Sequence, residues 1–220
     1  LIPKENQKFF SEKIIYLPDS YQPNDFTKKI SKKIFTREEL GLPKNGFVFC
    51  CFNQNYKITP NIFDIWMKIL KKIEGSVLWL IKDSNEGANN LKKEARKRGI
   101  NPDKIIFAKR MTASEHLARH KMADLFIDTF PYTAHTTCSD ALWSGLPVIT
   151  LMGQSFASRV SGSLLNAIGL KELITSTKKE YEDLIFELAT NPKKLKSIKS
   201  KLNKNKLTKP LFNTKLYTKK

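Results

Sequence analysis

Cysteine and long apolar runs are scarce in this sequence. Its 220 residues include three cysteines, of which Cys50 and Cys51 are adjacent and Cys138 stands alone. They form neither a disulfide framework nor a zinc-ligand pattern, so we expect small buried side chains in a reducing compartment. No apolar run approaches about 18 residues, so no membrane-spanning helix is predicted. The sequence begins at Leu1, without an initiator methionine or a signal-peptide pattern, and we expect a cytoplasmic fragment of a longer protein.

Motifs of several common enzyme classes are also absent. The sequence has no G-x-G-x-x-G, no G-x-x-x-x-G-K-[ST] and no G-x-S-x-G. These absences argue against a dinucleotide oxidoreductase, a P-loop enzyme and an α/β-hydrolase. There is no D-x-D triplet to hold a metal, and no internal repeat. The chemistry of the chain must therefore be sought in other residues.

Positive charge is abundant and comes almost entirely from lysine. Lysine and arginine number 39 against 21 acidic residues, for a formal net charge of +18. Only six of the 39 cations are arginines, and the lysines are spread over every segment. A nucleic-acid-binding face more often clusters arginine with aromatic residues. We therefore expect a general attraction to anionic ligands and keep nucleic-acid binding as an alternative.

The alternation of apolar and amphipathic segments predicts an α/β fold. Residues 1–46 are irregular and rich in turns, and the regular pattern starts at residue 47. We expect strands at 47–52, 76–81, 104–108, 124–129, 147–151 and 172–174, and helices at 60–74, 89–98, 114–122, 136–143, 155–168, 178–190 and 192–204. This order is typical of a Rossmann-like parallel sheet with helices on both faces. Ligands of such sheets bind beyond the carboxyl ends of the strands.

Polar side chains that suit a nucleotide follow the first and third strands. Gln54 and Lys57 come after the first, where a lysine suits a phosphate, although a solvated loop lysine fits the same pattern. His116 and Arg119 come after the third, on one helical face, where an imidazole and an arginine can stack on a base. His116 and His120 have the spacing of a metal pair, but no acidic or cysteine partner lies nearby in sequence, so no metal site is predicted.

The segment after the fourth strand is the most informative. Pro131 and a turn place His135, Thr136 and Thr137 at the N-terminus of a helix, where free N–H groups and the helix dipole attract an anion. Asp140 lies one turn further along and can accept a hydrogen bond from a ribose hydroxyl. An ordinary helix cap and an acid that balances the dipole are the alternatives. Together these segments predict a metal-free site for a nucleoside diphosphate, neutralised by protein cations and dipoles.

Several stretches of the sequence resemble one known family. They read YLPDSYQPND, FNQNYKITP, EHLARHKMADLFIDTFPYTAHTTCSDALWSGLPVITLMGQSFASRV and KPLFNTKLYT, in this order over nearly the whole chain. They are similar to the O-linked N-acetylglucosaminyltransferase family, which includes the SPINDLY-type enzymes. The resemblance implies an inverting, metal-independent glycosyltransferase of the GT-B architecture, without a cofactor. It implies UDP-N-acetylglucosamine (UDP-GlcNAc) as donor and a protein Ser or Thr hydroxyl as acceptor, with GDP-fucose as the alternative donor.

The resemblance also assigns roles to residues at the ligand edge. The matching positions are Gln54 and Lys57 at the diphosphate, Met111, His116 and Arg119 at the uracil ring, His135, Thr136 and Thr137 at the pyrophosphate and sugar, and Asp140 at the ribose. Lys57 is the catalytic residue among them, because it stabilises the leaving diphosphate, and Met111 acts through its backbone. Some family members carry a lysine where this chain has Ala113, so a ribose or phosphate contact is missing or comes from Lys109 or Arg110.

A GT-B enzyme needs two lobes, and this chain resembles only the C-terminal, donor-binding lobe. The resemblance implies that 1–46 is the tail of the N-terminal lobe and a connector, and that 47–191 is the nucleotide-sugar lobe. Residues 192–220 become a C-terminal helix and tail that pack toward the missing lobe, with apolar surface exposed along 1–45 and 192–220. The expected partners are a UDP-sugar, a protein acceptor, the N-terminal lobe and the tetratricopeptide repeats of a longer protein. Alone, the chain is expected to be inactive.

Overall fold

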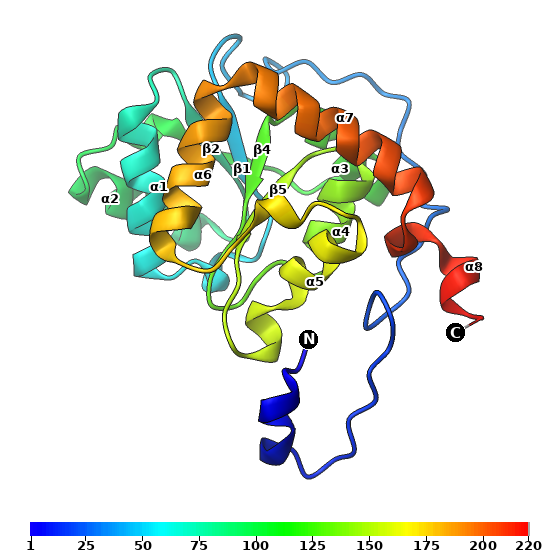
Figure 1. The fold of residues 1–220 in the computed structure, drawn as a ribbon. Coiled ribbons are helices and arrows are strands. Elements are labelled where there is room, and N and C mark those ends of the chain that lie inside the picture. Colours follow the sequence, from blue (N-terminus) through cyan, green and yellow to red (C-terminus); the bar gives the residue numbers. More distant parts are fainter. Residues whose placement is uncertain (220) are drawn as a thin grey trace.

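A six-stranded parallel sheet forms the centre of the computed structural model, which describes residues 1–219 (Figure 1). Its strands are β1 (Val48–Cys51), β2 (Val77–Ile81), β3 (Ile105–Ala108), β4 (Leu125–Ile127), β5 (Val148–Leu151) and β6 (Ile174–Thr175). They are arranged in the order β3-β2-β1-β4-β5-β6. The direction in which successive strands are added reverses between β1 and β4. Ligands of open α/β sheets bind at such a switch point, beyond the carboxyl ends of the strands. The predicted Rossmann-like fold is confirmed.

The strands are apolar because both faces of the sheet are covered. Every residue of β1, β4 and β5 is buried, as expected for parallel strands beneath two helical layers. In the register, Phe49 of β1 faces Leu78 of β2 on one side and Leu125 of β4 on the other. The central strands therefore hold their carboxyl ends at fixed positions in the core.

Helices cover both faces of the sheet. One layer holds α1 (Pro60–Lys72), α2 (Asn85–Lys97) and α6 (Lys178–Thr190), of which α1 and α6 contact each other (Figure 1). The other layer holds α3 (Ala113–Arg119), α4 (Thr136–Trp143) and α5 (Val160–Ala167), in contact in that order. Helix α7 (Pro192–Thr208) touches both α6 and α4, and the chain ends in α8 (Thr214–Tyr217). Within residues 1–219 no helix combines the length and the apolar character needed to cross a membrane.

Several helix boundaries differ from the predicted ones, for local reasons. Helix α2 begins at Asn85 instead of 89, because the Ser84 side chain caps it by accepting a hydrogen bond from the Gly87 N–H (2.9 Å). The helix expected at 114–122 ends at Arg119 and continues as a 3₁₀ turn. Thr59 stands at the N-cap of α1 as predicted, but its hydroxyl donates to the Phe130 carbonyl instead of capping the helix.

Residues 1–46 contain no strand and a single 3₁₀ helix (Lys4–Phe9). The first part of this segment reaches away from the sheet, and the later part runs along the α3–α4 side (Figure 1). There the Ser139 hydroxyl donates to the Asn24 side chain (2.7 Å), and the Thr214 hydroxyl donates to the Asn24 carbonyl (3.0 Å). The connector around Asn24 therefore lies beside α4 and the C-terminal segment. The division at 1–46, 47–191 and 192–220 stays a prediction.

Candidate functional site

Asn53 ties the carboxyl ends of β1 and β4 together at the point where the strand order reverses. Its buried amide donates to the Asp128 carboxylate (3.1 Å) and to the Thr129 hydroxyl (2.7 Å). Its amide oxygen accepts from the hydroxyl of Thr137, in the first turn of α4. Asn53 thus fixes the start of α4 relative to β1. The sequence interpretation missed this residue, although a polar side chain directly after a buried strand was a usable signal.

Asp128, immediately after β4, holds the following turn in place through hydrogen bonds. Its fully buried carboxylate accepts from the N–H groups of Thr129 (2.8 Å) and Ala134 (2.7 Å) and from the Thr150 hydroxyl (2.8 Å). The Tyr181 hydroxyl donates to its backbone carbonyl (2.7 Å). Burial raises the pKa of Asp128, while the hydrogen bonds to its carboxylate oppose that rise. Hydrogen bonds within the protein therefore fix the loop between β4 and α4.

Lys57 extends its ammonium group toward this turn. It ends a 3₁₀ turn after β1, and its Nζ donates to the Thr133 carbonyl (3.2 Å) and lies 3.7 Å from the centroid of the Tyr132 ring. Burial lowers the pKa of Lys57, against the opposing charge of Asp128. Within the described residues Lys57 forms no ion pair. The structure thus holds a half-buried cation without a direct counter-ion at the mouth of the sheet.

The predicted placement of His135, Thr136 and Thr137 at a helix N-terminus is confirmed. Helix α4 starts at Thr136, and its N-cap His135 makes no side-chain capping bond. Burial and then the charge of Lys57 lower the pKa of His135. The Lys57 ammonium contacts the carbonyl of Thr133, three residues before the first residue of α4. Such a combination of N–H groups, dipole and cation suits a phosphate.

Met111, His116 and Arg119 come together in a second part of the site. With Phe52 and Gln54 they border a cavity of about 200 Å³, whose remaining lining residues are Ile81 and Arg110. The His116 and Phe52 rings are 5.2 Å apart, and the Arg119 guanidinium lies 4.6 Å from the centroid of the Phe52 ring. An aromatic ring and a guanidinium thus border the cavity, and a planar ring can stack on such groups.

Burial determines the charge states of the two titratable side chains His116 and Arg119 beside this cavity. The buried Arg119 donates to the Lys109 carbonyl (2.5 Å) and to Nδ1 of His116. Burial and then the charge of Arg119 lower the pKa of His116 to about 4, and burial lowers that of Arg119 to about 10. His116 is therefore neutral and Arg119 charged at pH 7.

Gln54 and Asp140 support their predicted roles less directly, because both side chains contact other residues of the protein. Gln54 is exposed, and with its amide nitrogen assigned toward Asp83 it donates to both carboxylate oxygens, at 3.0 and 2.9 Å. Asp140, on α4, accepts from Lys28 of the connector at 2.5 Å. The cation beside Asp140 thus comes from the connector. That Lys109 or Arg110 supplies the contact missing at Ala113 stays a prediction.

Residues 1–219 contain no group of three or more His, Cys, Asp and Glu side chains that could hold a metal ion. The rings of His116 and His120 are 4.9 Å apart, but Nδ1 of His120 donates to the His116 carbonyl (2.8 Å). This nitrogen is therefore occupied by a backbone bond. Metal independence of the activity stays a prediction.

His120 makes the stability of the lobe depend on pH. The residue is 1% exposed, and burial followed by the charge of His116 lowers its pKa from 6.5 to about 3. Because the unfolded chain binds this proton first, stability is complete above pH 6.5 and is lost as pH falls toward 3. Over that range we expect His120 to change the folding equilibrium up to about tenfold per pH unit.

Urea unfolding at pH 7, 6 and 5 measures this effect against the His120→Gln variant. The carboxylates contribute equally to both proteins, so the wild type should lose stability more steeply than the variant. Parallel pH profiles would contradict the buried, neutral state of His120.

Comparisons with known proteins agree with the fold. The model of glycosyl transferase family 41 matches residues 24–220. A probable UDP-N-acetylglucosamine–peptide N-acetylglucosaminyltransferase of Arabidopsis thaliana is 38% identical over 96% of the chain, and a transferase of the same name from Caenorhabditis elegans is 37% identical over 83%. A solved mutant of the Thermobaculum terrenum O-GlcNAc transferase matches 99% of the chain with a TM-score of 0.85 and 26% identity.

The chain corresponds to only part of each of these proteins. It spans 22% of the Arabidopsis protein, 16% of the nematode protein and 42% of the Thermobaculum chain. The family model nevertheless covers all of the sheet, the switch point and α7. This chain belongs to glycosyl transferase family 41.

Proposed function

We propose that this chain is the donor-binding lobe of a transferase that moves N-acetylglucosamine from UDP-GlcNAc to a Ser or Thr hydroxyl of a protein. The reaction is a single displacement with inversion, and it needs no metal. The names of the two relatives support this donor and a peptide acceptor. The observation that carries the proposal is Lys57, held without an ion-pair partner in the described residues, beside the N-terminus of α4.

In this proposal the donor lies across the carboxyl ends of the strands. The uracil ring occupies the cavity beside His116 and Arg119, where the Met111 backbone reads the edge of the base. The ribose is held by Asp140, whose charge is balanced by Lys28. The diphosphate lies between Lys57, the Gln54 amide and the N-terminus of α4, where His135, Thr136 and Thr137 contact the pyrophosphate and the sugar.

The chemical role of this lobe is to stabilise the leaving group. The acceptor oxygen bonds to the anomeric carbon as the bond from that carbon to the β-phosphate oxygen breaks, and the electron pair passes to the diphosphate. The acceptor proton passes to a base, which we assign to the N-terminal lobe. Charge on the diphosphate grows as the bond breaks, so a fixed cation at Lys57 favours the transition state over the bound donor.

Apolar side chains exposed at the start of the chain support a second lobe as partner. Phe9, Ile15 and Ile34 are 75%, 81% and 88% exposed, and Leu207 of α7 is 76% exposed. Exposed apolar side chains are concentrated in residues 1–46, which supports a surface that another domain covers. The N-terminal lobe, the tetratricopeptide repeats and a cytoplasmic location belong to the proposal for the longer protein.

The donor assignment predicts selective binding of UDP without metal. In calorimetric titrations with EDTA present, we expect the chain to bind UDP at least tenfold more tightly than GDP. Added Mg²⁺ should leave the affinity unchanged, because protein cations and the α4 N-terminus neutralise the diphosphate.

The same titration separates the alternatives. Tighter binding of GDP would favour a GDP-fucose donor. Equal, strongly salt-dependent binding of both nucleotides would favour a nucleic-acid-binding domain. Binding of neither nucleotide would contradict a donor site contained in this chain.

A further inference from the structure

A second and larger cavity lies at the opposite edge of the sheet. Its volume is about 530 Å³, against about 200 Å³ beside His116. It opens where β4 and β5 begin, between the connector, the end of α3, the end of α4 and helix α7. None of its lining residues belongs to the proposed donor site, which occupies the carboxyl ends of the strands. This second cavity therefore needs its own explanation.

The lining of this cavity is strongly basic. Lys32, Lys121, Lys199 and Lys206 contribute to it, and no acidic residue does. Lys199 lies 3.8 Å from Asp124, which also binds Arg37. The other three lysines form no ion pair within residues 1–219.

The lysines also affect one another. Burial and then the charge of Lys121 lower the pKa of Lys206, whose ammonium group donates to the Trp143 carbonyl (3.3 Å). A bound anion would offset the positive charge that these lysines bring to the cavity.

Two buried polar atoms at this cavity lack hydrogen-bond partners in the described part of the chain, and they are independent of the lysines. They are Nε2 of His120 and Oγ of Ser144, in residues that are 1% and 8% exposed and that both line the cavity. Because Nδ1 of His120 donates to a carbonyl and the ring is neutral, Nε2 is an acceptor. Buried polar groups in native proteins are nearly always satisfied. A ligand that donates to His120 and accepts from Ser144 would satisfy both.

We propose that this cavity is a binding site for a small phosphorylated organic molecule that carries at least one hydroxyl group. Its phosphate contacts Lys121, Lys206 and the Ser144 hydroxyl, and its hydroxyl donates to Nε2 of His120. The volume lies within the range of small-molecule sites, roughly 300–1,000 Å³. Ile30 and Leu146 supply an apolar wall for the carbon skeleton. The proposal does not depend on the donor assignment, since the two sites share no residue.

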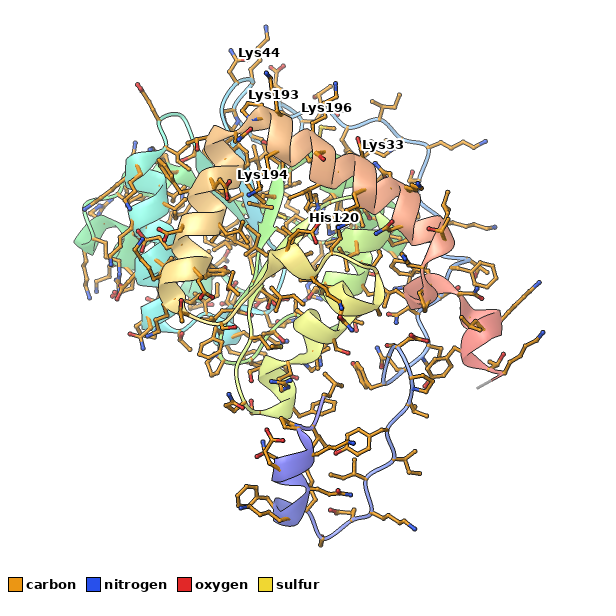
Figure 2. All side chains as sticks on the ribbon, viewed as in Figure 1. Lys33, Lys44, His120, Lys193, Lys194 and Lys196 are labelled. Atoms are coloured by element: carbon orange, nitrogen blue, oxygen red, sulfur yellow. The ribbon has the colours of Figure 1, made fainter. Side chains whose placement is uncertain are left out.

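Inorganic pyrophosphate is the probe that tests the anion part of the site. The full chain carries Lys57→Ala in every sample, which weakens the competing diphosphate site. In this background the pocket variant adds Lys121→Ala and Lys206→Ala. The control adds Lys193→Ala and Lys196→Ala, which remove the same charge from exposed positions on the first turns of α7, outside the cavity (Figure 2). By calorimetry we expect pyrophosphate affinity to fall at least tenfold in the pocket variant and less than twofold in the control.

Thermal unfolding tests whether the pocket variant and the control are equally stable. Without ligand the pocket variant should melt within a few degrees of the control, because the like charge it loses offsets the hydrogen bond from Lys206 to the Trp143 carbonyl (3.3 Å). Pyrophosphate should raise the melting temperature of the control and not that of the pocket variant. Ser144→Ala, which deletes a hydroxyl without a partner in residues 1–219, should weaken binding severalfold without loss of stability. An equal fall in affinity in both double variants, or no binding to the control, would overturn the proposal.

Discussion

Replacement of Lys57 by alanine is expected to slow sugar transfer by about a hundred- to a thousandfold in the complete protein. A cation about 4 Å from a phosphate oxygen, at an effective dielectric constant of about 20, contributes roughly 4 kcal/mol. Part of that energy acts on the bound diphosphate, and the part that grows with the leaving charge accelerates the reaction. In the isolated chain the same substitution should weaken UDP binding at least tenfold.

Lys68→Ala is the matched control for this experiment, because Lys68 is an exposed lysine of α1 without an ion pair in the described residues. Both variants should melt within a few degrees of the wild type, since Lys57 donates a single hydrogen bond and lies near the surface. Turnover of Lys57→Ala within about threefold of the Lys68→Ala value would remove Lys57 from the mechanism.

The fold was predictable because each strand is a short apolar run followed by a turn and an amphipathic segment. The Phe47–Phe52 run contains β1, and the limits of α4 and α6 match the predicted 136–143 and 178–190. The predicted helix limits are wrong where local hydrogen bonds determine where a helix begins. Ser84 starts α2 four residues early, and the predicted 155–168 helix divides into a 3₁₀ turn at Phe156–Ser158 and α5. Side-chain caps of this kind compete with apolar periodicity and are weak signals in sequence.

The candidate site was only partly predictable, because its supports are distant in sequence. His116 and Arg119 lie on one turn of helix, so their spacing alone predicted their contact. Asn53 and Asp128 are separated by 75 positions, and only the parallel pairing of β1 with β4 brings them together. Lys28 reaches Asp140 across 112 positions, from a segment without regular structure. Periodicity carries no information about such pairs.

Removal of the buried Asp128 carboxylate is expected to have the largest effect on stability. Asp128→Ala leaves the N–H groups of Thr129 and Ala134 and the side chains of Asn53 and Thr150 without their acceptor. An unsatisfied buried donor costs about 1–3 kcal/mol, and several donors lose Asp128 as acceptor at once. We expect the free energy of unfolding, measured in urea, to fall by about 3–5 kcal/mol. UDP binding should weaken as well, because this carboxylate fixes the turn that leads into α4.

Asp124→Ala is the control, because Asp124 flanks the same strand at its other end. Its side chain is 24% exposed and accepts from the Val48 N–H (2.8 Å) and from Arg37 (2.8 Å), so water can replace part of what is lost. We expect a loss of about 1 kcal/mol and unchanged UDP binding. Asp128→Asn keeps the shape and one acceptor oxygen, and it should fall between the two if the alanine variant does not fold. Equal losses in Asp128→Ala and Asp124→Ala would mean that water or a shifted backbone satisfies the Asp128 donors, and the turn before α4 would then owe its position to packing.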